Sequence, residues 1–180
     1  MDAETGTEKG RRAFFLDRDG VINVDHGYVF RTVDFEFMAN VFPVLRSLSA
    51  KGYLLVVVTN QSGIGRGYYT AEDCRKLTDW MLQRLSEEGV GVAAVYSCPH
   101  SPEAGCDCRK PAPGMFLQAE RELGLDLSAS WMLGDKESDM QAAEAAGIPN
   151  RVFLGTAVPE SATYAVAVLD EVLDLPVFEE

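Results

Sequence analysis

Short runs of apolar, often β-branched residues recur along the chain, and most end at a polar residue or a glycine. Runs that are apolar at consecutive positions are typical of strands buried on both faces, as in a parallel sheet. We expect a strand at each run, with a sixth candidate at residues 164–168. The five main runs cover residues 13–16, 53–58, 92–96, 131–133 and 151–154.

Apolar residues at helical spacing separate these runs. Residues 41–50 place Val41, Leu45 and Leu48 on one face, and Gly52 follows as a stop signal. We expect further helices over residues 70–88, 113–123 and 138–146. Strands that alternate with helices predict an α/β fold, a three-layer Rossmann-like parallel sheet with helices on both faces and no cap domain.

The chain has 180 residues, of which 47% are hydrophobic, and this suits one domain with a buried core. We assign residues 13–180 to that domain and expect residues 1–12 to form a disordered tail. No apolar run reaches the ~20 residues that span a bilayer, and no apolar signal segment is present, so we expect a cytoplasmic protein without membrane contact. The net charge of −12, with no basic run, disfavours nucleic-acid binding.

Five polar segments carry the candidate chemistry, and four of them come just after an apolar run. Ligands of parallel α/β folds bind beyond the carboxyl ends of the strands, so we expect one shared site there. The segments are residues 17–20, 59–62, 109–111, 134–136 and Asp139. Together they indicate phosphoryl transfer to an aspartate.

Asp17 and Asp19 stand two residues apart at a strand end, a spacing that points both carboxylates the same way. Two such carboxylates need a cation between them, and Mg²⁺ suits an oxygen-rich site with phosphate as a further ligand. Asp17 would attack phosphorus, and Asp19 would protonate the leaving oxygen and then activate water. Taken alone, the pair is equally consistent with an ordinary turn after a strand.

The remaining segments complete this hypothesis. The Thr59 hydroxyl and the amides of the next two residues would hold phosphate oxygens. Lys110 would offset the charge of Asp17 and of the phosphoryl group, Asp135 would complete the metal site, and Asp139 would act indirectly from one helical turn further on. Individually these residues have plainer interpretations, such as a surface lysine or a first-turn helix acid.

Three cysteines and a histidine gather in one stretch: Cys98, His100, Cys106 and Cys108. Three thiolates and one imidazole form a closed ligand set for structural Zn²⁺, which leaves no open position for catalysis. A zinc there would pin a long loop and thereby fix Lys110 beside the nucleophile. The alternative is a set of free thiols. Cys74 stands apart in a helical stretch and is expected to be a core thiol.

At this point the chain resembles the haloacid dehalogenase-like (HAD-like) phosphatase superfamily over residues 13–155. The first motif is Asp17-x-Asp19, the second Thr59, the third Lys110, and the fourth Asp135 with Asp139. The resemblance implies that Mg²⁺ is held by the Asp17 side chain, the Asp19 backbone carbonyl and Asp135.

Within that superfamily the cysteine-rich loop resembles two groups, the heptose 1,7-bisphosphate 7-phosphatases and the histidinol-phosphate phosphatases. Residues 17–23, 26–29, 59–67 and 134–136 resemble the heptose group. That resemblance implies a set of substrate-binding residues, namely Asp25, His26, Gly27, Tyr28, Asn60, Gln61, Ser62, Arg109 and Lys136.

The resemblance implies a monomeric Mg²⁺-dependent phosphatase. It would remove the 7-phosphate of D-glycero-D-manno-heptose 1,7-bisphosphate through an aspartyl-phosphate, in the synthesis of nucleotide-activated heptose for lipopolysaccharide. The short stretch from His100 to Cys106 favours histidinol phosphate instead. A non-enzymatic zinc-binding interaction module is a third possibility, which the intact set of catalytic residues disfavours. The preferred anomer of the sugar stays open.

Overall fold

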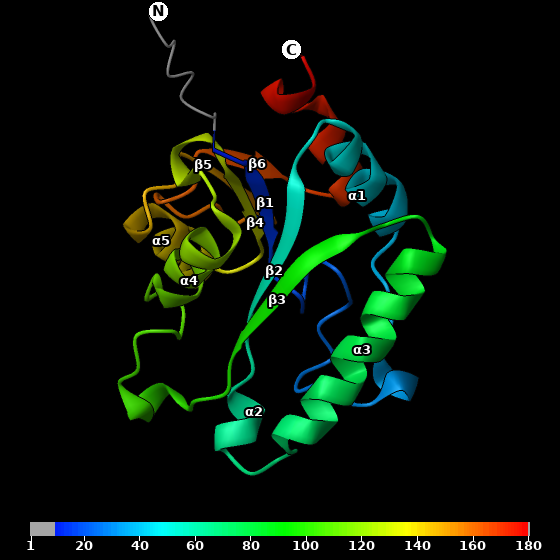
Figure 1. Cartoon of the computed structure of the whole chain (residues 1–180), viewed down its shortest axis with the longest axis vertical. Coiled ribbons are helices and arrows are strands. Elements are labelled where there is room, and N and C mark those ends of the chain that lie inside the picture. Colours follow the sequence, from blue (N-terminus) through cyan, green and yellow to red (C-terminus); the bar gives the residue numbers. More distant parts are fainter. Residues whose placement is uncertain (1–9, 180) are drawn as a thin grey trace, which may run out of the picture.

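The computed structural model describes residues 10–179 (Figure 1). Residues 1–9 of the expected tail therefore lie outside the described residues. The last two tail residues are bonded to the fold: the Asp126 amide donates to the Arg11 carbonyl at 2.8 Å, and the Leu54 amide donates to the Arg12 carbonyl at 3.0 Å. Residues 11 and 12 therefore belong to the folded backbone, although the sequence pattern assigned them to the tail.

One sheet of six parallel strands, in the order β3-β2-β1-β4-β5-β6, runs through the molecule. The strands are β1 (Ala13–Leu16), β2 (Leu54–Asn60), β3 (Val92–Cys98), β4 (Trp131–Gly134), β5 (Asn150–Leu154) and β6 (Tyr164–Val166). All six predicted strands are confirmed. β2 and β3 each run two residues beyond the apolar run, because their backbone pairing continues with Thr59 opposite Ser97 and Asn60 opposite Cys98.

The helices are α1 (Val41–Ala50), α2 (Ser62–Gly65), α3 (Ala71–Glu87), α4 (Gly114–Leu123) and α5 (Glu137–Ala145). Short 3₁₀ turns lie between or after these elements, at Thr32–Asp34, Pro102–Ala104, Leu127–Ala129, Leu169–Asp174 and Pro176–Phe178. Four of the helices were predicted. α2 was not, because a single turn with two glycines has no helical periodicity to detect.

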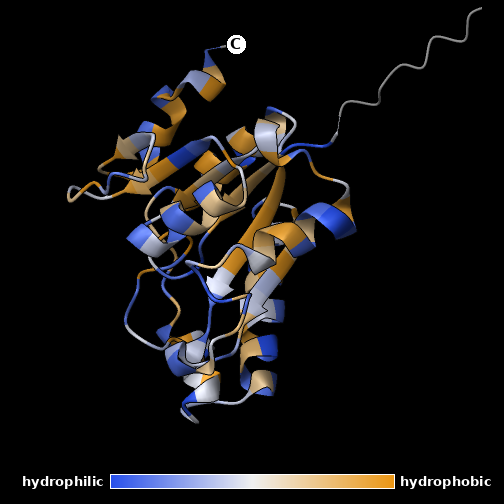
Figure 2. Ribbon diagram, turned by 90° about the vertical axis from the view of Figure 1, so that its left-hand side faces the viewer, coloured by the Kyte–Doolittle hydropathy of each residue, from blue (hydrophilic) through white to orange (hydrophobic). Residues whose placement is uncertain are grey.

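The sheet has a separate apolar core on each face, because alternate strand residues point to opposite sides. Phe14 and Leu16 of β1 pack under α1 and α3, whereas Phe15 packs under α4 and α5. Figure 1 shows the two helix pairs on opposite sides of the strands, and Figure 2 shows that the strands are the most hydrophobic part. The predicted three-layer α/β architecture is confirmed.

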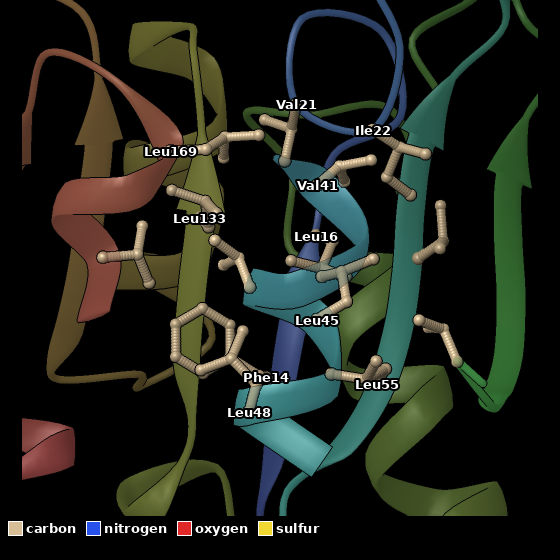
Figure 3. Packing of buried hydrophobic residues seen from close by; sticks show 14 of the residues in the cluster. Phe14, Leu16, Val21, Ile22, Val41, Leu45, Leu48, Leu55, Leu133 and Leu169 are labelled. Atoms are coloured by element: carbon tan, nitrogen blue, oxygen red, sulfur yellow. The ribbon is translucent and has the colours of Figure 1, made fainter. Parts of the chain in front are cut away.

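The loop after β1 is anchored in the first of these cores. Val21 and Ile22 are fully buried and lie against α1 beside Val41 (Figure 3). Since the two anchors follow Asp19 by only two and three residues, packing of the core also fixes the backbone of the acidic segment.

The strand order reverses at β1, which has β2 on one side and β4 on the other. At such a reversal the flanking loops part and leave a crevice beyond the carboxyl ends of the strands. β2 and β3 run toward this end, where α2 and the loop of residues 99–113 lie (lower part of Figure 1). Within residues 10–179, no helix has both the length and the apolar character needed to cross a membrane.

Truncation of the core on the α1 side should destabilise the fold without touching the crevice. Leu45 is buried in that core, so we expect Leu45→Ala to lower the free energy of unfolding by about 2–5 kcal/mol in urea denaturation. Val33 is 82% exposed, and the matched Val33→Ala change should stay within about 0.5 kcal/mol of wild type. Equal effects of the two changes would contradict the packing described.

Candidate active site

The predicted site residues converge on the crevice at the carboxyl edge of the sheet. Asp17 follows β1, Thr59 lies at the end of β2, and Asp135 follows β4. A pocket of about 310 Å³ opens beside them. Its lining consists of Asp19, Asp25, Gly27, Tyr28, Asn60, Gln61, Ser62, Tyr69, Arg109, Lys136 and Ser138. Eight of the nine expected substrate-binding residues are in this lining.

Lys110 lies at the centre of the site with its ammonium group buried among oxygen atoms. Its Nζ lies 3.0 Å from Asp17 Oδ1 and 2.6 Å from Asp139 Oδ1, and it donates to the Val58 carbonyl at 2.8 Å. The exposed fraction of its side chain is only 2%. A buried charge of this kind is tolerated only when it is paired with opposite charges and hydrogen-bonded, as here.

Asn60 holds the backbone of that lysine. Its Nδ2 donates to the Lys110 carbonyl, and the Lys110 amide donates to its Oδ1, both at 3.1 Å. The sequence assigned Asn60 to the substrate, but both polar ends of its side chain are bonded to Lys110. No sequence signal reveals this contact, because fifty residues separate the partners.

Asp139 is committed to contacts within the protein. One oxygen pairs with Lys110, and the other accepts the backbone N–H of Lys136 at 3.1 Å in a capping arrangement at the start of α5. Gly134 makes this position possible, since a Cβ there would lie 2.4 Å from the Asp139 Cβ. The structure therefore gives Asp139 an orienting role toward Lys110, in keeping with the indirect role expected.

Asp17 and Asp135 form an acidic pair, and the cations near them do not fully offset the effects of burial and of neighbouring negative charge. Burial raises the pKa of Asp135 to about 7, and the neighbouring charge of Asp17 adds to the rise. Burial and the charge of Asp139 raise the pKa of Asp17, and Lys110 opposes them. One oxygen of Asp135 is buried without a hydrogen bond. Such carboxylate oxygens fit a hard divalent cation such as Mg²⁺.

Gly20 lets Asp135 approach this position. Its φ of +91° lies in a region that favours glycine, and a Cβ there would lie 2.0 Å from an Asp135 oxygen. Because the glycine follows Asp19 directly, the acidic segment after β1 and the one after β4 can close on each other.

Asp19 is held in a cradle of three donors, two of which sequence reasoning gave no role. Arg18 Nη2 and Asn23 Nδ2 each donate to its Oδ1 at 3.0 Å, and Gln61 Nε2 donates to its Oδ2 at 3.1 Å. Arg18 also donates to the Val29 carbonyl and is almost fully buried. Its place between two aspartates was a signal, but such a pattern does not distinguish a buried clamp from a surface arginine.

Two cations line the pocket beyond these acids. Lys136 Nζ lies 3.3 Å from Asp25 Oδ2 and 3.8 Å from Asp135 Oδ1, and half of its side chain is exposed. Arg109 carries a buried Nη1 without a hydrogen-bond partner. An unsatisfied guanidinium donor beside the ammonium group of Lys136 at one pocket wall favours an anionic ligand.

His26 is the expected substrate-binding residue that the structure does not bring into the pocket. Its Nε2 lies 2.9 Å from Glu36 Oε2 on the exposed surface, and it lines a neighbouring hollow of about 430 Å³. Tyr28, two residues later, does reach the pocket, and its φ of +50° is unusual for a bulky residue.

The four expected zinc ligands lie together, with their ligand atoms within 4.8 Å of one another. Cys106 Sγ lies 3.6 Å from the Sγ atoms of Cys98 and Cys108, close to the ~3.8 Å edge of a tetrahedron with zinc–sulfur bonds of about 2.3 Å. His100 Nδ1 lies 3.4 Å from Cys98 Sγ. Burial opposes ionisation of Cys106, but hydrogen bonds, chiefly from the Arg109 backbone N–H, lower the pKa of its thiol to about 6. The cluster fits Zn²⁺.

Comparison with known proteins agrees with this geometry. A family model described as HAD-hydrolase-like matches residues 107–170. D-glycero-β-D-manno-heptose-1,7-bisphosphate 7-phosphatase from Photorhabdus laumondii is 47% identical, over 93% of this chain and 95% of that protein. The chain belongs to this family of HAD-like phosphatases.

Solved structures extend the family comparison to the fold. The D,D-heptose 1,7-bisphosphate phosphatase from B. bronchiseptica, complexed with magnesium and phosphate, is 29% identical with a TM-score of 0.83, covering 94% of this chain and 99% of that one. A HAD-like phosphatase from Mesorhizobium loti is 34% identical with a TM-score of 0.84, covering 95% and 86%. The Photorhabdus and B. bronchiseptica relatives both carry heptose bisphosphate phosphatase names, whereas the length of the cysteine-rich loop favoured the histidinol-phosphate group.

Removal of the Lys110 ammonium group should destabilise the fold strongly. In Lys110→Met two buried carboxylates lose their counter-ion, and we expect the free energy of unfolding to fall by about 3 kcal/mol or more in urea with a metal chelator present. The Asp17 carboxyl, with its pKa already raised, would bind its proton still more tightly in the folded chain. The variant should therefore lose stability as pH rises from about 5 to 8, more steeply than wild type.

The control is Lys76→Met, which removes a lysine whose side chain is 68% exposed and whose Nζ lies 4.0 Å from Glu72. This change should cost less than about 1 kcal/mol and leave the pH dependence as in wild type. A Lys110→Met protein as stable as this control would refute the buried ion-pair arrangement.

Proposed function

We propose that this protein is a Mg²⁺-dependent phosphatase that removes the 7-phosphate of D-glycero-β-D-manno-heptose 1,7-bisphosphate through an aspartyl-phosphate. The observation that carries the proposal is the buried ion pair of Lys110 and Asp17 beside a pocket that Arg109 and Lys136 line. The name of the Photorhabdus relative supports the substrate and its β anomer.

Asp17 is the proposed nucleophile. The Arg18 amide and Lys110 Nζ both donate to the same oxygen, Oδ1, at 2.9 and 3.0 Å. The other oxygen is thereby left to attack phosphorus. Lys110 opposes the rise in the pKa of Asp17 that burial causes and so favours the ionised, nucleophilic form of the carboxyl group.

Asp19 is the proposed acid and base. The donors around it hold its carboxyl group at the pocket wall, where it can protonate the leaving sugar oxygen. After the sugar leaves, the ionised Asp19 can take a proton from the water that attacks the phosphoaspartate. Thr59 would donate its hydroxyl proton to a phosphoryl oxygen.

Magnesium is the proposed catalytic cofactor. Asp17, Asp135 and the Asp19 backbone carbonyl would hold it, as the deficit of positive charge at the acidic pair suggests, and the B. bronchiseptica relative is a complex with magnesium and phosphate. When bound, the ion supplies positive charge that neutralises phosphoryl oxygens in the transition state.

A sugar with two phosphates matches the rest of the pocket. Arg109 and Lys136 would bind the phosphate that stays on the sugar, and the polar residues Asp25, Gly27, Tyr28, Gln61 and Ser62 would contact its hydroxyls. The product keeps its 1-phosphate and can proceed to nucleotide-activated heptose for lipopolysaccharide. We infer a monomeric enzyme of a single domain, since one chain supplies every group described. We also propose a cytoplasmic location.

Structural Zn²⁺ at Cys98, His100, Cys106 and Cys108 is the second proposed metal. Cys108 comes directly before Arg109 and Lys110, and the backbone N–H of Gln61 donates to the Cys98 carbonyl at 2.7 Å. A closed zinc site, worth on the order of 10 kcal/mol, would thus fix both the pocket arginine and the end of β2.

Phosphate release tests the proposed function. With Mg²⁺ present, we expect turnover of the β anomer of heptose 1,7-bisphosphate, slower turnover of the α anomer, and little turnover of histidinol phosphate. Asp17→Asn keeps the shape of the side chain but removes the nucleophile, so kcat/KM should fall at least about a thousandfold.

The matched control is Asp34→Asn, which neutralises a partly exposed aspartate in the 3₁₀ turn of Thr32–Asp34, outside the pocket lining, and should leave turnover unchanged. Preference for histidinol phosphate would overturn the proposed substrate. Full activity of Asp17→Asn would overturn the proposed nucleophile.

Metal analysis tests the zinc proposal. We expect about one zinc per chain in wild type and a loss of zinc in Cys98→Ser, with a lower melting temperature because the loop loses its closure. Cys74→Ser changes a cysteine outside the cluster, and its zinc content should match wild type. Zinc retained at the wild-type level in Cys98→Ser would contradict the ligand set.

A further inference from the structure

Gln61 connects three groups at the wall of the active site. Its Nε2 donates to Asp19 Oδ2 at 3.1 Å and to Thr59 Oγ1 at 2.8 Å, and its Oε1 accepts the Tyr69 hydroxyl at 2.5 Å. Both Gln61 and Thr59 are only 2% exposed. One buried amide therefore contacts both the proposed acid and the proposed phosphate-binding hydroxyl.

The direction of this amide follows from the chemistry of its neighbours. Asp19 Oδ2 and Thr59 Oγ1 both accept from Gln61, and only the NH₂ end of a side-chain amide can donate, so that end faces them. The carbonyl oxygen then points the opposite way and needs a donor, because an unsatisfied buried acceptor is costly. Tyr69 supplies that donor.

Tyr69 is held firmly for this contact. Its ring stacks on Phe30 with centroids 5.0 Å apart and planes within 10°, and the side chain is buried. Burial raises the pKa of its phenol to about 12, so the hydroxyl keeps its proton at neutral pH. Gly63 provides the space, since a Cβ there would lie 2.1 Å from the Tyr69 ring.

The glycines after Ser62 are therefore part of this arrangement. Gly63 and Gly65 both lie in α2. A Cβ at Gly65 would lie 2.7 Å from the Ser101 amide nitrogen, so α2 also packs on the cysteine-rich loop.

We propose that Tyr69 is a positioning residue that fixes the orientation of the Gln61 amide, and through it both Asp19 and the Thr59 hydroxyl. This inference rests on the proposed phosphatase function. Because Gln61 Nε2 occupies a lone pair of Thr59 Oγ1, the hydroxyl proton of Thr59 is directed elsewhere and can be donated to a phosphoryl oxygen. If the amide turned around, its carbonyl would face the Asp19 carboxylate and repel it.

The test is Tyr69→Phe, which removes only the hydroxyl and keeps the stacked ring. We expect kcat to fall about tenfold or more, with KM changed less than about threefold, because the sugar contacts remain while the reacting groups lose their alignment. The control is Tyr96→Phe. Tyr96 is also buried and donates to Glu122 Oε2 at 2.7 Å, but it lies on the α4 side of the sheet, so kcat should be unchanged.

A double-mutant cycle separates positioning from general stability. If Tyr69 acts only through the amide, Tyr69→Phe should cost nothing further in a Gln61→Ala background. Melting temperatures of all variants are measured in parallel. An additive loss in the double variant, or wild-type kcat in Tyr69→Phe, would overturn the proposal.

Two substrates keep this test distinct from that of the proposed function. Each variant is assayed with heptose 1,7-bisphosphate and with a simple aryl phosphate. If the wild-type protein turned over only the aryl phosphate, the proposed substrate would be overturned. The double-mutant cycle would then be measured with the aryl phosphate. A wild-type protein inactive toward both would overturn the phosphatase function and, with it, the role given to Tyr69.

Discussion

The buried ammonium group of Lys110 is the contact on which the site depends. It joins Asp17 after β1, Asp139 in α5 and the carbonyl of Val58 in β2, so three elements meet at one charge. Each partner alone would be a costly buried group, and together they offset one another. The reversal of strand order at β1 is what allows these elements to meet.

The space left by three glycines matters in this site as much as the side chains that surround it. Gly20 admits Asp135, Gly134 admits Asp139, and Gly63 admits Tyr69. At each position a Cβ would lie within 2.4 Å of an atom of its neighbour. The three glycines come from different segments of the chain, yet each has the same effect of bringing an oxygen-bearing side chain to its place.

The strands and long helices were predictable because apolar periodicity reports burial directly. The convergence of Asp17, Thr59 and Asp135 was also predictable, since parallel strands deliver their carboxyl ends to one edge. The contact of Asn60 with the Lys110 backbone and that of Tyr69 with Gln61 were not. Their partners depend on how loops fold back in three dimensions, and an asparagine or tyrosine beside a motif carries no signal that names its partner. The single-turn helix α2 was not predicted for a similar reason, because packing rather than intrinsic helix propensity forms it.

The central claim is that phosphoryl transfer passes through Asp17. The stereochemical course at phosphorus tests it most directly, using a heptose bisphosphate whose 7-position carries a phosphorothioate made chiral with two oxygen isotopes. Hydrolysis in water that contains the third isotope then releases a chiral inorganic thiophosphate, whose configuration can be determined. Transfer to Asp17 and then to water comprises two in-line displacements, so the account predicts overall retention of configuration. Inversion would mean direct attack by water and would contradict the role given to Asp17.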